Sequence, residues 1–348
     1  MIDPETTPHP QAADGRNIDQ TLGALRGEGA QQVVAHLADE RPDQVRPRRF
    51  ESTAEADSYY GLPLLKEVVW KWPVPAYFYV GGLAGASAAL GAAALLRDLR
   101  GIVRAGRFLS LGGAALGSAL LIEDLGVRRR FVYMMRVFRP TSPMNLGTWL
   151  LTAFGSAAGA SVVLPGKGAT IAGVAAGVLG LPLCGYTGVL IGNTAVPLWK
   201  EGRAWLPPLF AASAAASAAS AMELLPWKPR EERVVRRLAV LGKAAEMIAD
   251  FFLEARVSRI ERVGRPLARS LSGALWKTAK LCTGASLGIS LVRHKSPRLR
   301  FAAGILGTAG ALLTRFALHH GGKASARDPH AVFAQQRAPC LGLFLESR

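Results

Sequence analysis

Apolar residues in this chain come in long blocks that contain no charged side chain. Charge-free runs occupy residues 72–96, 140–166, 168–199 and 204–222. About 20 apolar residues are enough for a helix to cross the hydrocarbon core of a bilayer. These four runs therefore predict membrane-spanning helices.

Four weaker segments complete the pattern. Residues 105–122 are short but lie next to arginines whose long side chains can reach the membrane surface, and the other three carry a few charges within a helical pattern. We predict an all-α integral membrane protein with about eight transmembrane helices and with both termini on one side. The predicted spans are residues 73–96, 105–122, 143–164, 170–192, 204–222, 234–254, 271–292 and 300–318.

The pattern also divides the chain into regions. Residues 1–57 are polar and contain many Pro and Gly residues, which predicts a mostly disordered tail. Residues 58–225 form a first bundle, residues 226–319 form a second bundle, and residues 320–348 form a C-terminal tail.

The sixth predicted helix carries a stripe of charges. Lys243 precedes Glu246 by three positions, and Glu246, Asp250 and Glu254 follow at intervals of four, so all four side chains share one face. Facing lipid, each central charge would cost about 2.5–3.5 kcal/mol, so we expect the stripe to face other helices. Lys243 neutralises only one acid. Lys243, Glu246 and Asp250 are therefore a candidate proton path, and the alternative is a packing ion pair with an interfacial Glu254.

Composition and charge exclude several functions. The formal net charge is +17, but residues 1–72 hold eight Lys or Arg and twelve Asp or Glu, so the excess lies between the predicted spans. That is where membrane proteins carry cations, and we expect no nucleic-acid partner. The three cysteines have no metal-ligand spacing, and none of the six histidines lies in the middle of a span. We therefore expect no metal site, no haem with two His ligands and no iron–sulfur cluster in this chain.

Polar and aromatic groups gather where the first, second and fourth spans meet one surface. Trp72 and Tyr77 begin the first span, Asp124 ends the second, and Tyr186 and Asn193 lie toward the end of the fourth. A quinone pocket needs apolar walls, donors to the carbonyl groups and a group that relays protons. The alternatives are an ion pair of Asp124 with Arg128 or Arg130, and a Tyr186 that only packs.

Three stretches together resemble the NrfD/PsrC-type (polysulfide reductase) membrane-subunit family. They are "YYGLPLLKEVVWKWPVPAYFYVGGLAGAS" (59–87), "LLIEDLGVRRRFVYMMRVFRPTSPMNLGTW" (120–149) and "GYTGVLIGNTAVPLWKEGRAWLPPLFAASAAASAAS" (185–220). The resemblance covers most of residues 58–225 and keeps the motifs in order.

The resemblance implies eight helices in two four-helix bundles, with a quinone pocket in the first. Asp124 falls on the family's acidic position and Tyr186 on its quinone-contacting tyrosine. Tyr77 falls where some members have His, and Val74 where those members have Asn. That departure leaves the donor set and the type of quinone open, menaquinone or ubiquinone.

The function that follows is that of a membrane-anchoring, quinone-interacting subunit of a multi-subunit oxidoreductase in the cell membrane. The resemblance implies a ferredoxin-like iron–sulfur partner and, through it, a molybdopterin-type catalytic subunit. We expect no substrate turnover from the chain alone. One alternative is a transporter or proton-translocating module without quinone chemistry, and another is a purely structural anchor.

Overall fold

The computed structural model describes residues 17–19, 24–26, 64–66, 68–125, 130–292 and 296–337. The chain divides into two units, Met1–Tyr59 and Tyr60–Arg348. In the first unit, β1 (Asn17–Asp19) and β2 (Ala24–Arg26) pair antiparallel, with Ile18 opposite Leu25. The rest of the predicted tail 1–57 lies outside the described residues, and so does most of the predicted tail beyond residue 337.

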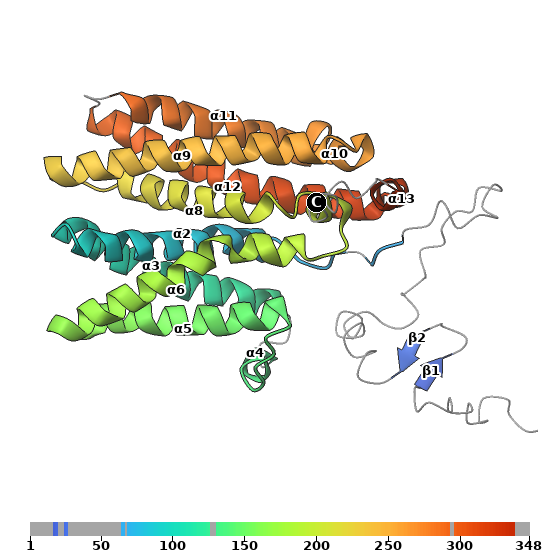
Figure 1. Cartoon of the computed structure of the whole chain (residues 1–348), viewed down its shortest axis with the longest axis horizontal. Helices are drawn as coiled ribbons and strands as arrows, with labels where there is room; N and C mark the ends of the chain where they lie inside the picture. The colour runs from blue at the N-terminus through green and yellow to red at the C-terminus, as the bar shows by residue number, and fades with distance from the viewer. Residues whose placement is uncertain are drawn as a thin grey trace, which may run out of the picture. The chain divides into compact units, whose positions relative to one another are not determined.

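The described part of the second unit is helical (Figure 1). Eight of its helices have 18 residues or more, and each contains one of the predicted spans or most of it. They are α2 (Pro73–Leu95), α3 (Arg100–Asp124), α5 (Pro143–Val163), α6 (Gly166–Gly192), α8 (Leu206–Glu223), α9 (Pro229–Val257), α11 (Leu271–Leu291) and α12 (Pro297–Arg327). The shorter helices are α4 (Arg130–Met134), α7 (Pro197–Glu201), α10 (Glu261–Ala268) and α13 (Pro329–Arg337).

Proline sets where many of these helices begin. Pro73, Pro143, Pro197, Pro229 and Pro297 each lie in the first turn of a helix. Proline has a fixed φ that suits a helix. It lacks a backbone N–H group, but an N–H group in the first turn would have no partner within the helix. Each of these prolines therefore helps to fix where its helix begins.

Five helices are long and apolar enough to cross a membrane: α2, α3, α5, α6 and α12. The other three long helices, α8, α9 and α11, are less apolar, because α8 is rich in Ala and Ser and the other two carry charges. The described part of the second unit is thus an all-helical structure with five candidate spans. The count of eight spans and their division into two bundles stay predictions.

The long helices pack in two neighbouring groups. Helices α2, α3, α5 and α6 pack on one another, and so do α8, α9, α11 and α12, while α8 packs on both α2 and α6 (Figure 1). Glycines make the closest approaches. A Cβ added to Gly85 of α2 would lie 2.6 Å from the carbonyl oxygen of Gly180 on α6, so the two backbones are nearly in contact. Small residues allow this approach when lipid supplies no hydrophobic driving force.

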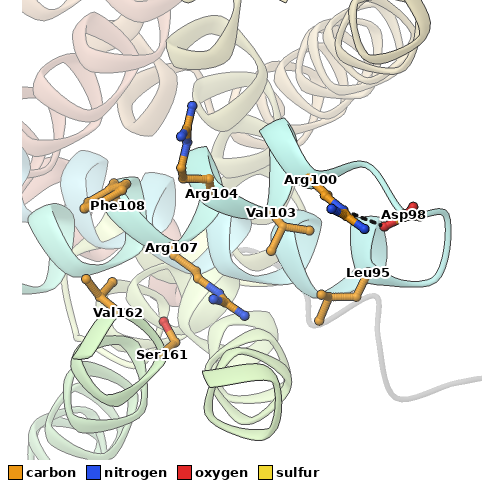
Figure 2. Close-up of a pocket in the computed structure, with 9 residues that line it drawn as sticks. All are labelled: Leu95, Asp98, Arg100, Val103, Arg104, Arg107, Phe108, Ser161 and Val162. Carbon is orange, nitrogen blue, oxygen red and sulfur yellow. Dashed lines mark hydrogen bonds and ion pairs between the residues drawn. The ribbon is translucent and has the colours of Figure 1, made fainter. Parts of the chain in front are cut away.

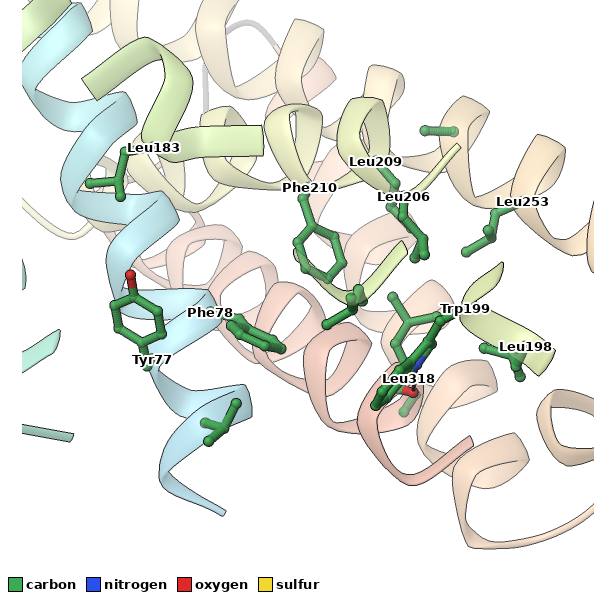
Figure 3. Close-up of a cluster of buried hydrophobic side chains, with 14 of the residues drawn as sticks. Tyr77, Phe78, Leu183, Leu198, Trp199, Leu206, Leu209, Phe210, Leu253 and Leu318 are labelled. Atoms are coloured by element: carbon green, nitrogen blue, oxygen red, sulfur yellow. Dashed lines mark hydrogen bonds between the residues drawn. The ribbon is translucent and has the colours of Figure 1, made fainter. Parts of the chain in front are cut away.

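Trp199 on α7 ties several helices together in the core (Figure 3). Its ring is buried and stacks on Trp70, with centroids 5.7 Å apart, and its Nε1 donates to the carbonyl oxygen of Leu318 at 2.8 Å. The backbone N–H of Leu198 donates to Ser325 Oγ at 3.3 Å. These contacts explain why α12 continues beyond the predicted end at residue 318.

Candidate functional site

Asp124 ends α3 beside the segment that leads into α2. The backbone N–H of Lys71 donates to Asp124 Oδ1 at 3.1 Å, and the carboxylate is half-buried. The acid is therefore anchored at the start of the first apolar helix, with part of its surface open. The alternative ion pair with Arg128 or Arg130 falls outside the described side chains.

Tyr186 lies on α6 and reaches the start of α5. Its hydroxyl donates to the carbonyl oxygen of Pro143, and its ring lies against Gly147, where an added Cβ would collide with it. The glycine therefore makes room for the tyrosine. In this arrangement the hydroxyl proton is held by a backbone carbonyl, while the phenol oxygen can still accept a hydrogen bond.

Tyr77, near the start of α2, lies at the same end of the helix group as Asp124 and Tyr186, which lie toward the ends of α3 and α6. Helices α2 and α6 run antiparallel past the contact of Gly85 with Gly180, and the Tyr77 and Tyr186 phenols lie within electrostatic reach of each other. Tyr77 is 3% exposed and packs on α3, where an added Cβ at Gly117 would lie 3.3 Å from its ring. Its ring is thus part of the helix packing.

The other two predicted quinone contacts face outward at this end. Trp72 is 63% exposed, as befits a residue just before an apolar helix, and Asn193 is exposed as the C-cap of α6. The structure therefore brings an acid, two phenols and an exposed indole to one end of α2, α3 and α6. Whether they bind a quinone is not tested by this geometry, and the assignment stays a prediction.

A cavity lies at the opposite end of α3. It has a volume of about 480 Å³ and is lined by residues of the α2–α3 link, by the first turns of α3 and by Ser161 and Val162 of α5 (Figure 2). None of its lining residues is a predicted quinone contact. Sequence reasoning did not identify this cavity, because its walls come from three segments with no shared motif.

Three charged residues of α9 are buried, as the cost of facing lipid predicts. Lys243, Glu246 and Asp250 are each at most 1% exposed. Lys243 Nζ lies 2.5 Å from Glu223 Oε2 on α8 and donates to Ser290 Oγ on α11 at 3.1 Å. Ser290 in turn donates to Glu223 Oε1 at 2.9 Å. The cation that we expected to neutralise an acid of its own helix thus binds a carboxylate from another.

Arg315 of α12 supplies a second buried cation. It is 1% exposed, its Nη2 donates to the carbonyl oxygen of Phe210 at 3.2 Å, and its guanidinium carbon lies 3.9 Å from the centre of the Phe210 ring. Both Glu246 and Asp250 lie within its electrostatic reach. Within the described residues, both carboxylate oxygens of Glu246 and Oδ1 of Asp250 are buried without a hydrogen-bond partner.

Glu254 ends this line of charges at a more open position. Lys280 Nζ on α11 lies 2.5 Å from Glu254 Oε2, and Trp276 Nε1 donates to the same oxygen at 3.3 Å. The side chains of Lys280 and Glu254 are 36% and 41% exposed. Buried charges thus run along α9 from Lys243 to a half-exposed pair.

Metal-ligand geometry is absent from the described part of the chain. No group of three or more His, Cys, Asp or Glu side chains is placed there to hold a metal ion. His319 and His320 are neighbours on α12 with ring centroids 5.5 Å apart. The predicted lack of haem and of iron–sulfur clusters is not tested by these positions.

Comparison with known proteins identifies the family. No curated protein matches the chain. The sequence profile of the polysulfide reductase family matches residues 56–328, which is well over half of the 348 residues and includes all eight long helices. With its five apolar helices, the chain is an integral membrane protein, and it belongs to the NrfD-type polysulfide reductase family.

Proposed function

We propose that the chain is the membrane-anchoring, quinone-interacting subunit of a multi-subunit oxidoreductase. The observation that carries the proposal is the family match over residues 56–328, since this family suggests membrane subunits of oxidoreductase complexes. Electrons would pass between the quinone pool of the cell membrane and a ferredoxin-like iron–sulfur partner. That partner would in turn contact a molybdopterin-type catalytic subunit.

The end of α2, α3 and α6 that holds Asp124 is the proposed quinone site. Asp124 would hold and pass the proton that quinone chemistry requires, because it is a half-buried carboxylate held by Lys71. Tyr186 would donate to a quinone carbonyl once its hydrogen bond to Pro143 opens, and Tyr77 and Trp72 would form apolar walls. Menaquinone and ubiquinone both fit this set of groups.

All eight long helices are proposed to span the bilayer as two four-helix bundles. The support comes from the middle of α9, where Lys243, Glu246 and Asp250 are buried. The exposed side chains there include Leu241, Ile248 and Phe251, at 69%, 58% and 66%. A helix with charges inside and apolar side chains outside suits contact with lipid. Reporter fusions at residue 60 and after residue 337 should label the same side of the membrane. Labelling of opposite sides would contradict eight spans.

Two substitutions test the quinone site in the assembled complex. Asp124→Asn and Tyr186→Phe should each slow quinone-coupled turnover by about 10²-fold or more, the low end for lost acid–base help. Glu123→Gln and Tyr133→Phe are the controls, because these exposed residues lie near Asp124 in the sequence and should leave turnover unchanged. Membrane insertion should be normal in all four variants. Near-normal turnover in both test variants would mean that Asp124 and Tyr186 serve only structure.

A second candidate function is proton translocation along α9. The observation that favours it is the pair of buried carboxylates, Glu246 and Asp250. Both oxygens of Glu246 and Oδ1 of Asp250 lack hydrogen-bond partners among the described residues. Buried polar groups of this kind are usually protonated or bound to internal water, and both states can relay a proton.

Reconstituted vesicles distinguish a proton path from a packing role. The double variant Glu246→Gln with Asp250→Asn should abolish proton movement while leaving quinone reduction measurable. Glu254→Gln is the matched control, since Glu254 shares the helix face but is 41% exposed. If proton movement is unchanged in the double variant, the stripe is structural.

A further inference from the structure

The cavity of about 480 Å³ at the start of α3 is unusually rich in arginine. Arg100, Arg104 and Arg107 all line it, and Figure 2 shows Arg107 turned toward Ser161 of α5 and Arg104 turned to the other side of α3. Arg107 Nη2 donates to the carbonyl oxygen of Ala169 on α6 at 3.1 Å, so this side chain is fixed between helices.

A second cavity continues around the same helix turns. Its volume is about 1060 Å³, and it shares Arg100, Arg104 and Phe108 with the first cavity before it reaches Trp227 in the α8–α9 link. The two cavities therefore flank the first turns of α3. Together they form one groove, the α3 groove, with shared arginines and a shared aromatic side chain.

Positive charge in the α3 groove is only partly balanced by the protein. Arg100 pairs with Asp98 at 3.3 Å, and the Glu231 carboxylate accepts from the backbone N–H of Gly101 at 2.7 Å. The Arg104 side chain has no hydrogen bond or ion pair with any residue that the structure describes. The first turn of α3 contains no acidic residue, although a helix N-terminus favours negative charge. The groove thus holds more cations than carboxylates, and Arg104 is the cation that the protein leaves unpaired among the described residues.

Apolar surface lies directly beside these cations. Leu95 and Val162 line the first cavity, and Phe108 is 60% exposed between the two. Arg100 and Arg107 are about 10 Å apart along a helix that begins shortly after the apolar helix α2 ends. If α2 and α3 span the bilayer, these cations lie near the edge of its hydrocarbon core. Arginine at this depth extends its charge toward the surface and leaves its stem along the chains.

We propose that the α3 groove binds an anionic phospholipid of the surrounding bilayer. Its headgroup phosphate accepts hydrogen bonds from Arg104 and Arg100, and its acyl chains lie along Phe108, Leu95 and Val162. Arginine suits this role because its guanidinium forms paired hydrogen bonds with phosphate oxygens. A phospholipid carries both a negative headgroup and apolar chains, and the groove has arginines beside apolar side chains.

The test compares lipid retained by two variants with the same net charge. In the double variant Arg100→Gln with Arg104→Gln the groove loses the two cations proposed to hold the phosphate, while Arg107 keeps its hydrogen bond to Ala169 on α6. The matched control is Arg233→Gln with Arg237→Gln, because these exposed arginines lie four and eight positions into α9, at the same end of the helices but outside the groove. The full-length proteins are purified in mild detergent, and bound phospholipid is measured by mass spectrometry of extracted lipid.

The unmodified protein and the α9 control should retain about one phosphatidylglycerol per chain, and the groove variant should lose most of it. In nanodiscs, replacing part of the phosphatidylcholine by phosphatidylglycerol should raise the thermal midpoint by about 5 °C in the first two proteins and not in the third. Equal retention by all three would refute the proposal, as would equal loss in both variants. A full rise with inorganic phosphate alone, in phosphatidylcholine nanodiscs, would assign the groove to a free anion instead.

Discussion

Replacing Lys243 by Met removes a cation from the most buried ion pair among the described residues. Lys243 and Glu223 are 0% and 1% exposed, and Nζ lies 2.5 Å from Oε2. The Glu223 carboxylate would then lie in the interior without this cation, and breaking a buried pair in this way costs about 3–5 kcal/mol. Lys280→Met is the matched control, because Lys280 and Glu254 have the same Nζ–Oε2 distance of 2.5 Å but are 36% and 41% exposed. An exposed pair contributes about 0–1 kcal/mol.

The free energy of unfolding of both variants can be measured by titration with a denaturing detergent, followed by circular dichroism. Lys and Met have similar helix propensities, so the difference between the two variants reports the surroundings of the pair. Adding Glu223→Gln to Lys243→Met should recover much of the loss, since the buried charge is then removed as well. Equal destabilisation by Lys243→Met and Lys280→Met would refute the idea that burial sets the strength of the pair.

Four further substitutions test the packing and the second buried cation. Gly180→Ala should lower the free energy of unfolding by about 1–3 kcal/mol, because the new methyl group meets the backbone of α2. Gly112→Ala, with open space around it, should raise the free energy of unfolding by up to about 1 kcal/mol in the same assay. Trp199→Phe should lower it by about 0.5–1.5 kcal/mol, since the Leu318 carbonyl on α12 loses the hydrogen bond from the indole. Arg315→Met should lower the free energy of unfolding, and adding Glu246→Gln should restore part of that loss; no restoration would show that the two groups do not interact.

The positions of the long helices were predictable because each needs only a local signal. A charge-free run of about 20 residues predicts a span wherever it occurs, and prolines in the first turn mark the starts of α2 and α5. The inward direction of the α9 stripe was also predictable. Its four charged residues recur at helical spacing, and lipid penalises that face whatever the neighbouring helices are.

The partners of that stripe were not predictable from the sequence. Glu223, Ser290 and Arg315 lie on three different helices, and each is separated by many residues from the charge that it meets. In the sequence, Glu223 is the polar residue that ends an Ala-rich predicted span. Arg315 is a charge near the end of a less apolar predicted span. Only the packing of α8, α11 and α12 around α9 brings them together.

Helix α9, which we propose to span the bilayer, also shows what a criterion of apolarity alone leaves out. Mean hydropathy treats every charge as if it faced the surroundings, but in α9 Lys243, Glu246 and Asp250 face the protein, and the exposed positions include Leu241 and Phe251. A helix enclosed in this way presents lipid with an apolar surface and its neighbours with a polar one.

The cost of burying those charges then depends on the pairs they form, and Glu246 and Asp250 have buried oxygens without hydrogen bonds among the described residues. A helix that needed only to pack would gain by replacing these two acids with apolar residues, because a well-packed apolar core is often the more stable one. Their presence is therefore the strongest structural reason to look for a proton along α9.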